Sequence, residues 1–258
     1  MRIHHLNCAT MRPPLAPAMV AHVLLLERTD GLTLVDSGFG TADIAQSRRL
    51  GRPFLAAVRP ALDASETALQ QVRGLGFTAD DVTDVVLTHL DLDHAGGIGD
   101  FPRARVHVHA RELAAARRPP LRERARYVAA QWAHGPQWVE HAEDGDDWFG
   151  FASITALADD VLLVPLPGHT RGHSAVAVRR DDGHWLLHAG DAFFAGTQMD
   201  QPPTCPPSLA AFQKLMAVDD GARAVNLRRL QQLAHERAEA VTVFCAHDRG
   251  QFEELAAV

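Results

Sequence analysis

The hydrophobic positions of the chain fall into short runs that are separated by turn residues and by longer amphipathic stretches. Runs of apolar, β-branched residues are typical of strands buried on both faces. These runs predict strands at 20–27, 32–35, 84–87, 161–165, 175–178, 185–189 and 241–245. The stretch at 104–109, in which apolar and polar residues alternate, predicts a further strand. Apolar residues at helical spacing predict helices at 63–76, 111–117, from 208 onward and at 222–238. This succession of helices and strands predicts an α/β fold in which at least part of the sheet lies between helices.

Turn residues mark the boundaries of several of these elements. Asp30-Gly31 between the first two runs is a strong hairpin signal, and Gly183 marks a second hairpin. At the start of the helix at 63–76, Asp63 with Glu66 is typical of a capping box, and Ser65 is the alternative cap. The chain has no internal repeat and no obvious linker, so we expect residues 1–258 to form one domain.

The composition excludes several classes of function. Of the 258 residues, 47% are hydrophobic and 22% are charged, as in ordinary globular proteins. A net charge of −7 provides no basic surface, so we expect no nucleic-acid partner. Cys8, Cys205 and Cys245 are few and far apart, which favours a reducing compartment. No stretch has the apolar length of a signal peptide or a membrane span, so we expect a cytoplasmic protein without a membrane partner.

The densest group of metal-type side chains lies in the sequence T-H-L-D-L-D-H at 88–94. It contains His89, Asp91, Asp93 and His94, and it follows a predicted strand. Open α/β proteins bind their ligands at the carboxyl ends of strands. Four such side chains on one turn cannot all point outward, so some of them must converge. Imidazole and carboxylate groups at this density are typical ligands of zinc, iron or manganese.

Three further candidate ligands also follow predicted strands. They are His169 in P-G-H-T-R-G-H, Asp191 after a glycine, and His247 after the last strand. With the first four they supply four imidazoles and three carboxylates, enough to hold two divalent ions with a shared carboxylate. Two such ions lower the pKa of a shared water and polarise a substrate oxygen. The set therefore predicts a hydrolytic site.

Other residues near these positions allow more than one interpretation. Asp36, close to two glycines, is either a turn residue or a brace for a neighbouring site. His173 is expected to bond groups around the ligands. His107 and His109 share a strand face, but no carboxylate cluster accompanies them, so we expect them to be structural. The aromatic-rich segment 117–151 either covers a binding cleft or forms a local core.

The ordered set of motifs resembles the metallo-β-lactamase superfamily, in particular its lactonase and glyoxalase II-like branches. The resemblance covers nearly the whole chain, and the motifs that carry it are Asp36-Ser37-Gly38, His89–His94, Pro167-Gly168-His169-Thr170, Gly190-Asp191 and His247. It implies a four-layer αββα sandwich. It also implies two metal sites that share a bridging Asp191, one at His89, Asp91 and His169 and the other at Asp93, His94 and His247.

The resemblance also implies roles for individual residues. Asp93 would direct a metal-bound hydroxide at a carbonyl and pass its proton to the leaving group. Asp36 and His173 would support the ligands. Tyr127, the only tyrosine, is a candidate partner of a substrate carbonyl in the pocket, as in some lactonases.

Asp91 departs from the usual motif of the family, H-x-H-x-D-H, because it stands where the second histidine is expected. The additional carboxylate adds one negative charge and shifts metal preference toward harder ions. We therefore expect two divalent ions, zinc first, with manganese or iron favoured by Asp91. The other outcomes are a single ion at Asp93, His94 and His247, or an inactive site.

The function implied is that of a metal-dependent hydrolase acting on an ester, lactone or thioester of a small molecule. A carboxylate also stands at this position in the flavo-diiron branch, so a diiron oxidoreductase is one alternative, and a non-catalytic metal-binding module is another. Glyoxalase II itself is not expected, because the chain ends soon after His247, and neither is a secreted β-lactamase. Burial of the aromatic segment against a second subunit would give a homodimer.

Overall fold

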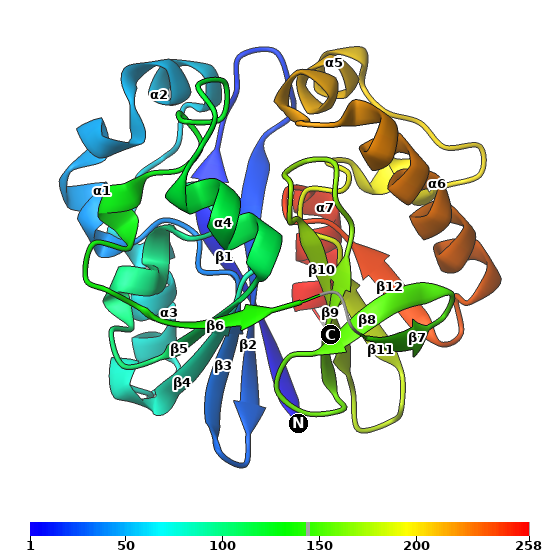
Figure 1. Cartoon of the computed structure of the whole chain (residues 1–258), viewed down its shortest axis with the longest axis horizontal. Coiled ribbons are helices and arrows are strands. Elements are labelled where there is room, and N and C mark those ends of the chain that lie inside the picture. Colours follow the sequence, from blue (N-terminus) through cyan, green and yellow to red (C-terminus); the bar gives the residue numbers. More distant parts are fainter. Residues whose placement is uncertain (143–144, 258) are drawn as a thin grey trace.

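Two β-sheets pack face to face with helices outside each of them in the computed structural model, which describes residues 1–142 and 145–257 (Figure 1). The strand orders are β1-β2-β3-β4-β5-β6 and β12-β11-β10-β9-β8-β7. This arrangement confirms the four-layer αββα sandwich. The first sheet contains β1 (Arg2–Met11), β2 (Met19–Arg28), β3 (Gly31–Val35), β4 (Val82–Val86), β5 (Arg105–His109) and β6 (Gln137–His141).

The second sheet is formed by the carboxyl-terminal half of the chain (Figure 1). It contains β7 (Asp146–Trp148), β8 (Phe151–Thr155), β9 (Val161–Pro165), β10 (Ser174–Arg179), β11 (Trp185–His188) and β12 (Val241–Phe244). The helices are α1 (Thr41–Ala45), α2 (Arg52–Val58), α3 (Ala68–Gly74), α4 (Ala110–Arg117), α5 (Pro207–Met216), α6 (Asp220–Glu236) and α7 (Arg249–Ala256). Across residues 1–142 and 145–257, no helix is both long enough and apolar enough to cross a membrane.

The apolar side chains of β2 alternate between two cores, which explains why this strand is hydrophobic at nearly every position. Val23 and Leu25 face the core on the helical side of the first sheet. Leu24 and Leu26 face the opposite way, into the core between the two sheets. We call this second group the inter-sheet core: Leu24, Leu26, Val35, Val86, Ile154, Ala156, Val161, Leu163, Val176, Val178, Leu186 and Phe244.

Strand direction brings the candidate ligands to one edge of the sandwich. In the first sheet β3 and β4 are parallel, so Asp36 and the 89–94 loop leave it on the same side. In the second sheet β9 and β11 are each antiparallel to β10, and β11 is parallel to β12. These three strands therefore run the same way, and the loops that follow them all lie at one edge.

The helix predicted at 63–76 is divided in two, which corrects the expected capping. Asp63 caps a short 3₁₀ turn at Ala64–Glu66, and its carboxylate accepts from the amide of Ser65. Thr67 then interrupts the turn with extended backbone and caps α3. Neither the Asp63–Glu66 capping box nor a Ser65 cap begins the helix, because the glutamate instead accepts hydrogen bonds from Thr10 of β1.

The aromatic-rich segment 117–151 connects the two sheets and supplies β6 and β7, each at the edge of its sheet. Its aromatic side chains join both main cores. Tyr127, Trp132 and Trp138 pack in the core of the first sheet, whereas Trp148 packs in that of the second. Residues 143–144 of this segment lie outside the described part of the chain.

We expect Leu24→Ala to lower the free energy of unfolding by about 2–5 kcal/mol, because it opens a cavity between the sheets. Leu24 is fully buried, whereas Leu15 is 83% exposed and serves as the matched control. Leu15→Ala should change stability by no more than about 0.5 kcal/mol. Denaturant unfolding of both variants measures the difference, and equal effects would contradict the layered core.

Candidate metal centre

The seven candidate ligands lie in four loops, after β4, β9, β11 and β12. The structure brings all of them together in two adjacent sets, and within each set the ligand atoms lie within 4.8 Å of one another. Six of the seven side chains are buried, and Asp93 is partly exposed. The first set is His89, Asp91, His169 and Asp191, and the second set is Asp93, His94 and His247.

Asp191 joins the two sets, because each of its carboxylate oxygens faces one of them. Its Oδ2 lies 3.7 Å from Nε2 of His89 and 3.3 Å from Nε2 of His169. Its Oδ1 lies 3.3 Å from Nε2 of His94 and 3.0 Å from Nε2 of His247. This is the geometry of a carboxylate that bridges two cations.

The buried polar atoms of these sets fit a metal centre. Nε2 of His89, Nε2 of His94 and Oδ1 of Asp91 are buried and have no hydrogen-bond partner. Buried polar atoms normally have a partner, so unpaired nitrogens that converge on carboxylates fit a cation-binding site. Burial opposes a charge on His94, yet Asp191 and Asp36 raise its pKa well above the usual value. The centre therefore attracts positive charge.

Asp36 holds two of the ligand histidines in place. Its Oδ2 accepts a hydrogen bond from Nδ1 of His94 at 2.9 Å, and its Oδ1 accepts from the Thr88 amide at 2.8 Å. The Thr88 hydroxyl lies 2.9 Å from Nδ1 of His89. Burial alone would raise the pKa of Asp36, but the neighbouring His94 outweighs it and lowers the pKa to about 2. Asp36 therefore braces the site as an ionised carboxylate, with a left-handed backbone at φ 60°.

His247 and His173 are oriented by backbone groups. Nδ1 of His247 donates to the Val20 carbonyl at 2.8 Å, which leaves its Nε2 free to act as a ligand. Nδ1 of His173 donates to the Leu166 carbonyl, and its Nε2 accepts from the Asp191 amide at 2.9 Å. His173 thus fixes the backbone of the bridging aspartate and is absent from both ligand sets.

Two supports of the centre could not be recognised in the sequence. Glu112 is fully buried in α4, and its carboxylate accepts hydrogen bonds from the amides of Leu90 and Gly172, both at 3.0 Å. It thereby ties the 89–94 loop to the loop that carries His169. Gln131 donates to the Leu92 carbonyl at 2.8 Å. Both side chains bond backbone groups that are distant in the sequence, so no local pattern marks them.

The model of the metallo-beta-lactamase superfamily matches residues 16–242. The chain belongs to this superfamily. A protein of Mycobacterium tuberculosis named "Probable metallo-hydrolase" is 46% identical over 253 residues, which cover 96% of this chain and 80% of that protein. An N-acyl homoserine lactonase of Agrobacterium fabrum is 28% identical over 228 residues, which cover 87% of this chain and 80% of the lactonase.

Solved structures of this superfamily share the fold. An N-acyl homoserine lactone hydrolase with N-hexanoyl-L-homoserine bound at its catalytic metal centre aligns with a TM-score of 0.75 at 19% identity. The alignment covers 98% of this chain and 95% of that structure. The likeness confirms the superfamily fold over nearly the whole length of the chain.

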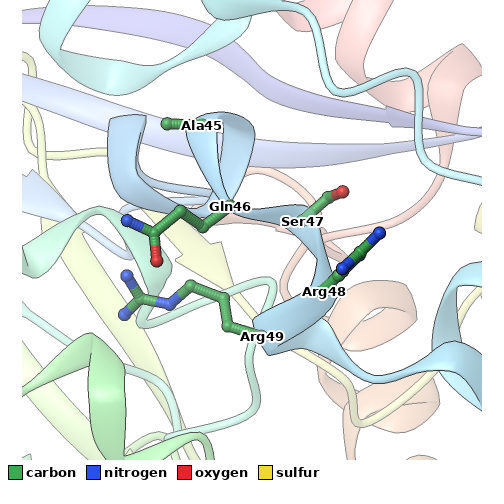
Figure 2. Close-up of a pocket in the computed structure, with 5 residues that line it drawn as sticks. All are labelled: Ala45, Gln46, Ser47, Arg48 and Arg49. Atoms are coloured by element: carbon green, nitrogen blue, oxygen red, sulfur yellow. The ribbon is translucent and has the colours of Figure 1, made fainter.

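A surface hollow lies on the segment that follows α1 and is lined by Ala45, Gln46, Ser47, Arg48 and Arg49 (Figure 2). It contains none of the candidate ligands. Figure 2 shows that Gln46 and Arg49 extend to the same side of the segment. Arg49 forms an ion pair with buried Asp43, with 3.1 Å between Nε and Oδ1. Asp43 also accepts from Gln131, so this hollow adjoins the supports of the metal centre rather than the centre itself.

The other residues singled out in the sequence are absent from both ligand sets. The hydroxyl of Tyr127 donates to Glu112, and the side chain is only 6% exposed. Its place in a substrate pocket stays a prediction. His107 bonds Asp84 and His141 within the first sheet, and neither His107 nor His109 belongs to a ligand set.

We expect Asp36→Asn to weaken metal binding by about 10–100-fold, because an amide holds the His94 ring less firmly than a carboxylate does. Competition with a chelating dye measures the affinity. Asp84→Asn is the matched control, since Asp84 is a buried carboxylate that bonds His107 at 2.8 Å outside the centre. Equal affinities in Asp36→Asn and Asp84→Asn would contradict the role of Asp36.

Proposed function

We propose that this chain is a hydrolase that uses two divalent metal ions to cleave an ester, lactone or thioester of a small molecule. The observation that carries the proposal is the pair of ligand sets that share Asp191 and contain unpaired, buried imidazole nitrogens. The names of the related metallo-hydrolase and N-acyl homoserine lactonase support the same class of reaction.

The first ion would be held by His89, Asp91 and His169 and the second by Asp93, His94 and His247, with Asp191 between them. We propose zinc as the resident metal, with manganese or iron as alternatives because of the third carboxylate. Bound ions of this kind activate water and polarise a carbonyl oxygen. The work of the chain is to hold the ligands rigidly and to move protons.

Preorganisation of the ligands comes from residues that are themselves buried and hydrogen-bonded. Asp36 and Thr88 fix the rings of His94 and His89, and the Val20 carbonyl fixes His247. Ligands held in this way need little rearrangement when a substrate binds, which keeps the cost of reaching the transition state low.

Asp93 is suited to proton transfer. It is the only candidate ligand that is partly exposed, with 13% of its side chain accessible, and its Oδ2 lies 3.7 Å from Nε2 of His247. A carboxylate at the open side of the centre can accept the proton released as water attacks a carbonyl. It can then return that proton to the departing oxygen or sulfur.

Metal removal and reloading test the proposal. Protein treated with a chelator should lose hydrolysis of a panel containing an N-acyl homoserine lactone, a thioester and an aryl ester. Zinc or manganese should restore it, with about two equivalents bound per chain. No turnover of any member of the panel by protein with two bound ions would contradict the proposal. Oxygen reduction by iron-loaded protein would favour the diiron alternative, which rests on the carboxylate of Asp91 alone.

We expect Asp93→Asn to reduce kcat by about 10²–10⁴-fold, because an amide cannot accept the proton. Since Asp93 is also a candidate ligand, metal content is measured in the same samples. Asp30→Asn, at a carboxylate that is 66% exposed, is the control and should leave kcat unchanged. A kcat close to that of the wild type in Asp93→Asn would exclude this role.

A further inference from the structure

Arg126 is a buried cation beside the one ligand that departs from the family motif. Its Nη1 lies 3.3 Å from Oδ2 of Asp91, and each of the two side chains is only 8% exposed. The same carboxylate oxygen lies 3.0 Å from Nε2 of His169. The guanidinium therefore contacts a member of the first ligand set directly.

Backbone groups also hold this arginine in place. Nη1 also donates to the carbonyl of His169 at 3.2 Å, and Nη2 donates to the carbonyl of Met216. Met216 is the last residue of α5, and the carboxyl end of a helix favours a positive charge. Arg126 is thus anchored by two backbone carbonyls in addition to the ion pair.

The ion pair balances the charge that the motif gains. An aspartate in place of a neutral histidine adds one negative charge to a buried centre that already contains Asp191. A buried charge without a partner is strongly unfavourable. Arg126 lies 3.3 Å from the Asp91 carboxylate and supplies the opposite charge. The carboxylate still has lone pairs for a metal, because each ionised oxygen accepts more than one partner.

We propose that Arg126 and Asp91 act as one neutral unit that takes the place of the second histidine of the motif. Asp91 supplies the ligand atom for the first metal. Arg126 cancels the added charge, and it thereby sets the affinity of the first ligand set for its metal. The inference rests on the proposed two-metal centre and not on turnover of any substrate.

A double-mutant cycle at positions 91 and 126 tests this unit. Asp91→His alone should reduce bound zinc from about two equivalents to about one, because the uncompensated guanidinium then repels the ion. Asp91→His combined with Arg126→Met should restore two equivalents. Arg126→Met alone should lower the Tm of the metal-free protein, and added metal should reverse that loss. Elemental analysis after desalting and thermal unfolding with and without chelator provide the measurements.

Three further variants separate charge balance from simple anchoring. Arg126→Lys keeps the charge and should retain two equivalents of zinc. Arg171→Met is the control. It breaks an ion pair of two hydrogen bonds to Glu123, which lies three residues before Arg126, and it should leave metal content unchanged. Asp91→Asn replaces Asp91→His in the cycle if the larger ring prevents folding.

Additive effects would overturn the proposal. If Arg126→Met lowered zinc content and Tm equally in the wild-type chain and in the Asp91→His variant, its role would be limited to anchoring the carbonyls of His169 and Met216. If positions 91 and 126 are coupled but the protein hydrolyses no substrate of the panel, the Arg126–Asp91 unit is supported and the proposed function is contradicted. If the protein hydrolyses a substrate but the two positions are not coupled, the function is supported and the unit is contradicted.

Discussion

The carboxylate of Asp191 lies between candidate ligands that follow strands of both sheets. One of its oxygens lies 3.7 Å from His89, which follows a strand of the first sheet, and 3.3 Å from His169, which follows a strand of the second. These distances require the sheets to keep a fixed position relative to each other. The inter-sheet core supplies that constraint, because close-packed side chains such as Leu24 and Phe244 resist sliding. The stability of the sandwich and the geometry of the centre therefore depend on the same contacts.

A second layer of buried polar groups gives several of the candidate ligands a defined orientation. Asp36 bonds His94 directly and reaches His89 through Thr88. Glu112 fixes the backbone at Leu90. In surroundings of low dielectric such bonds are strong when complete, and each missing partner is costly. These bonds orient His89 and His94 and leave their buried Nε2 atoms without a hydrogen-bond partner.

The grouping of the candidate ligands could be predicted from the sequence, because each loop that carries them follows an apolar run and the ends of parallel strands meet at one edge of a sheet. Strand β1 could not be predicted, since His4, His5 and Asn7 disturb its alternation at half-buried positions. The helix boundary at Thr67 was missed for a related reason, because Glu66 bonds Thr10, which is 56 residues away. Glu112 looks like an ordinary helical surface residue, and only the tertiary fold shows that it is buried.

Contacts between distant parts of the sequence also decide the effect of Asp91, which replaces the second histidine of the family motif. A motif reports which atoms can bind a metal, but the field at the metal also depends on charges that other parts of the chain bring close. From the motif alone, a third carboxylate weakens the Lewis acidity of the bound ions. Arg126 comes from a distant part of the sequence, and its guanidinium is 3.3 Å from that carboxylate. With the two charges counted together, the first ligand set has the same net charge as one with histidine at position 91, so the substitution is compatible with a working metal centre.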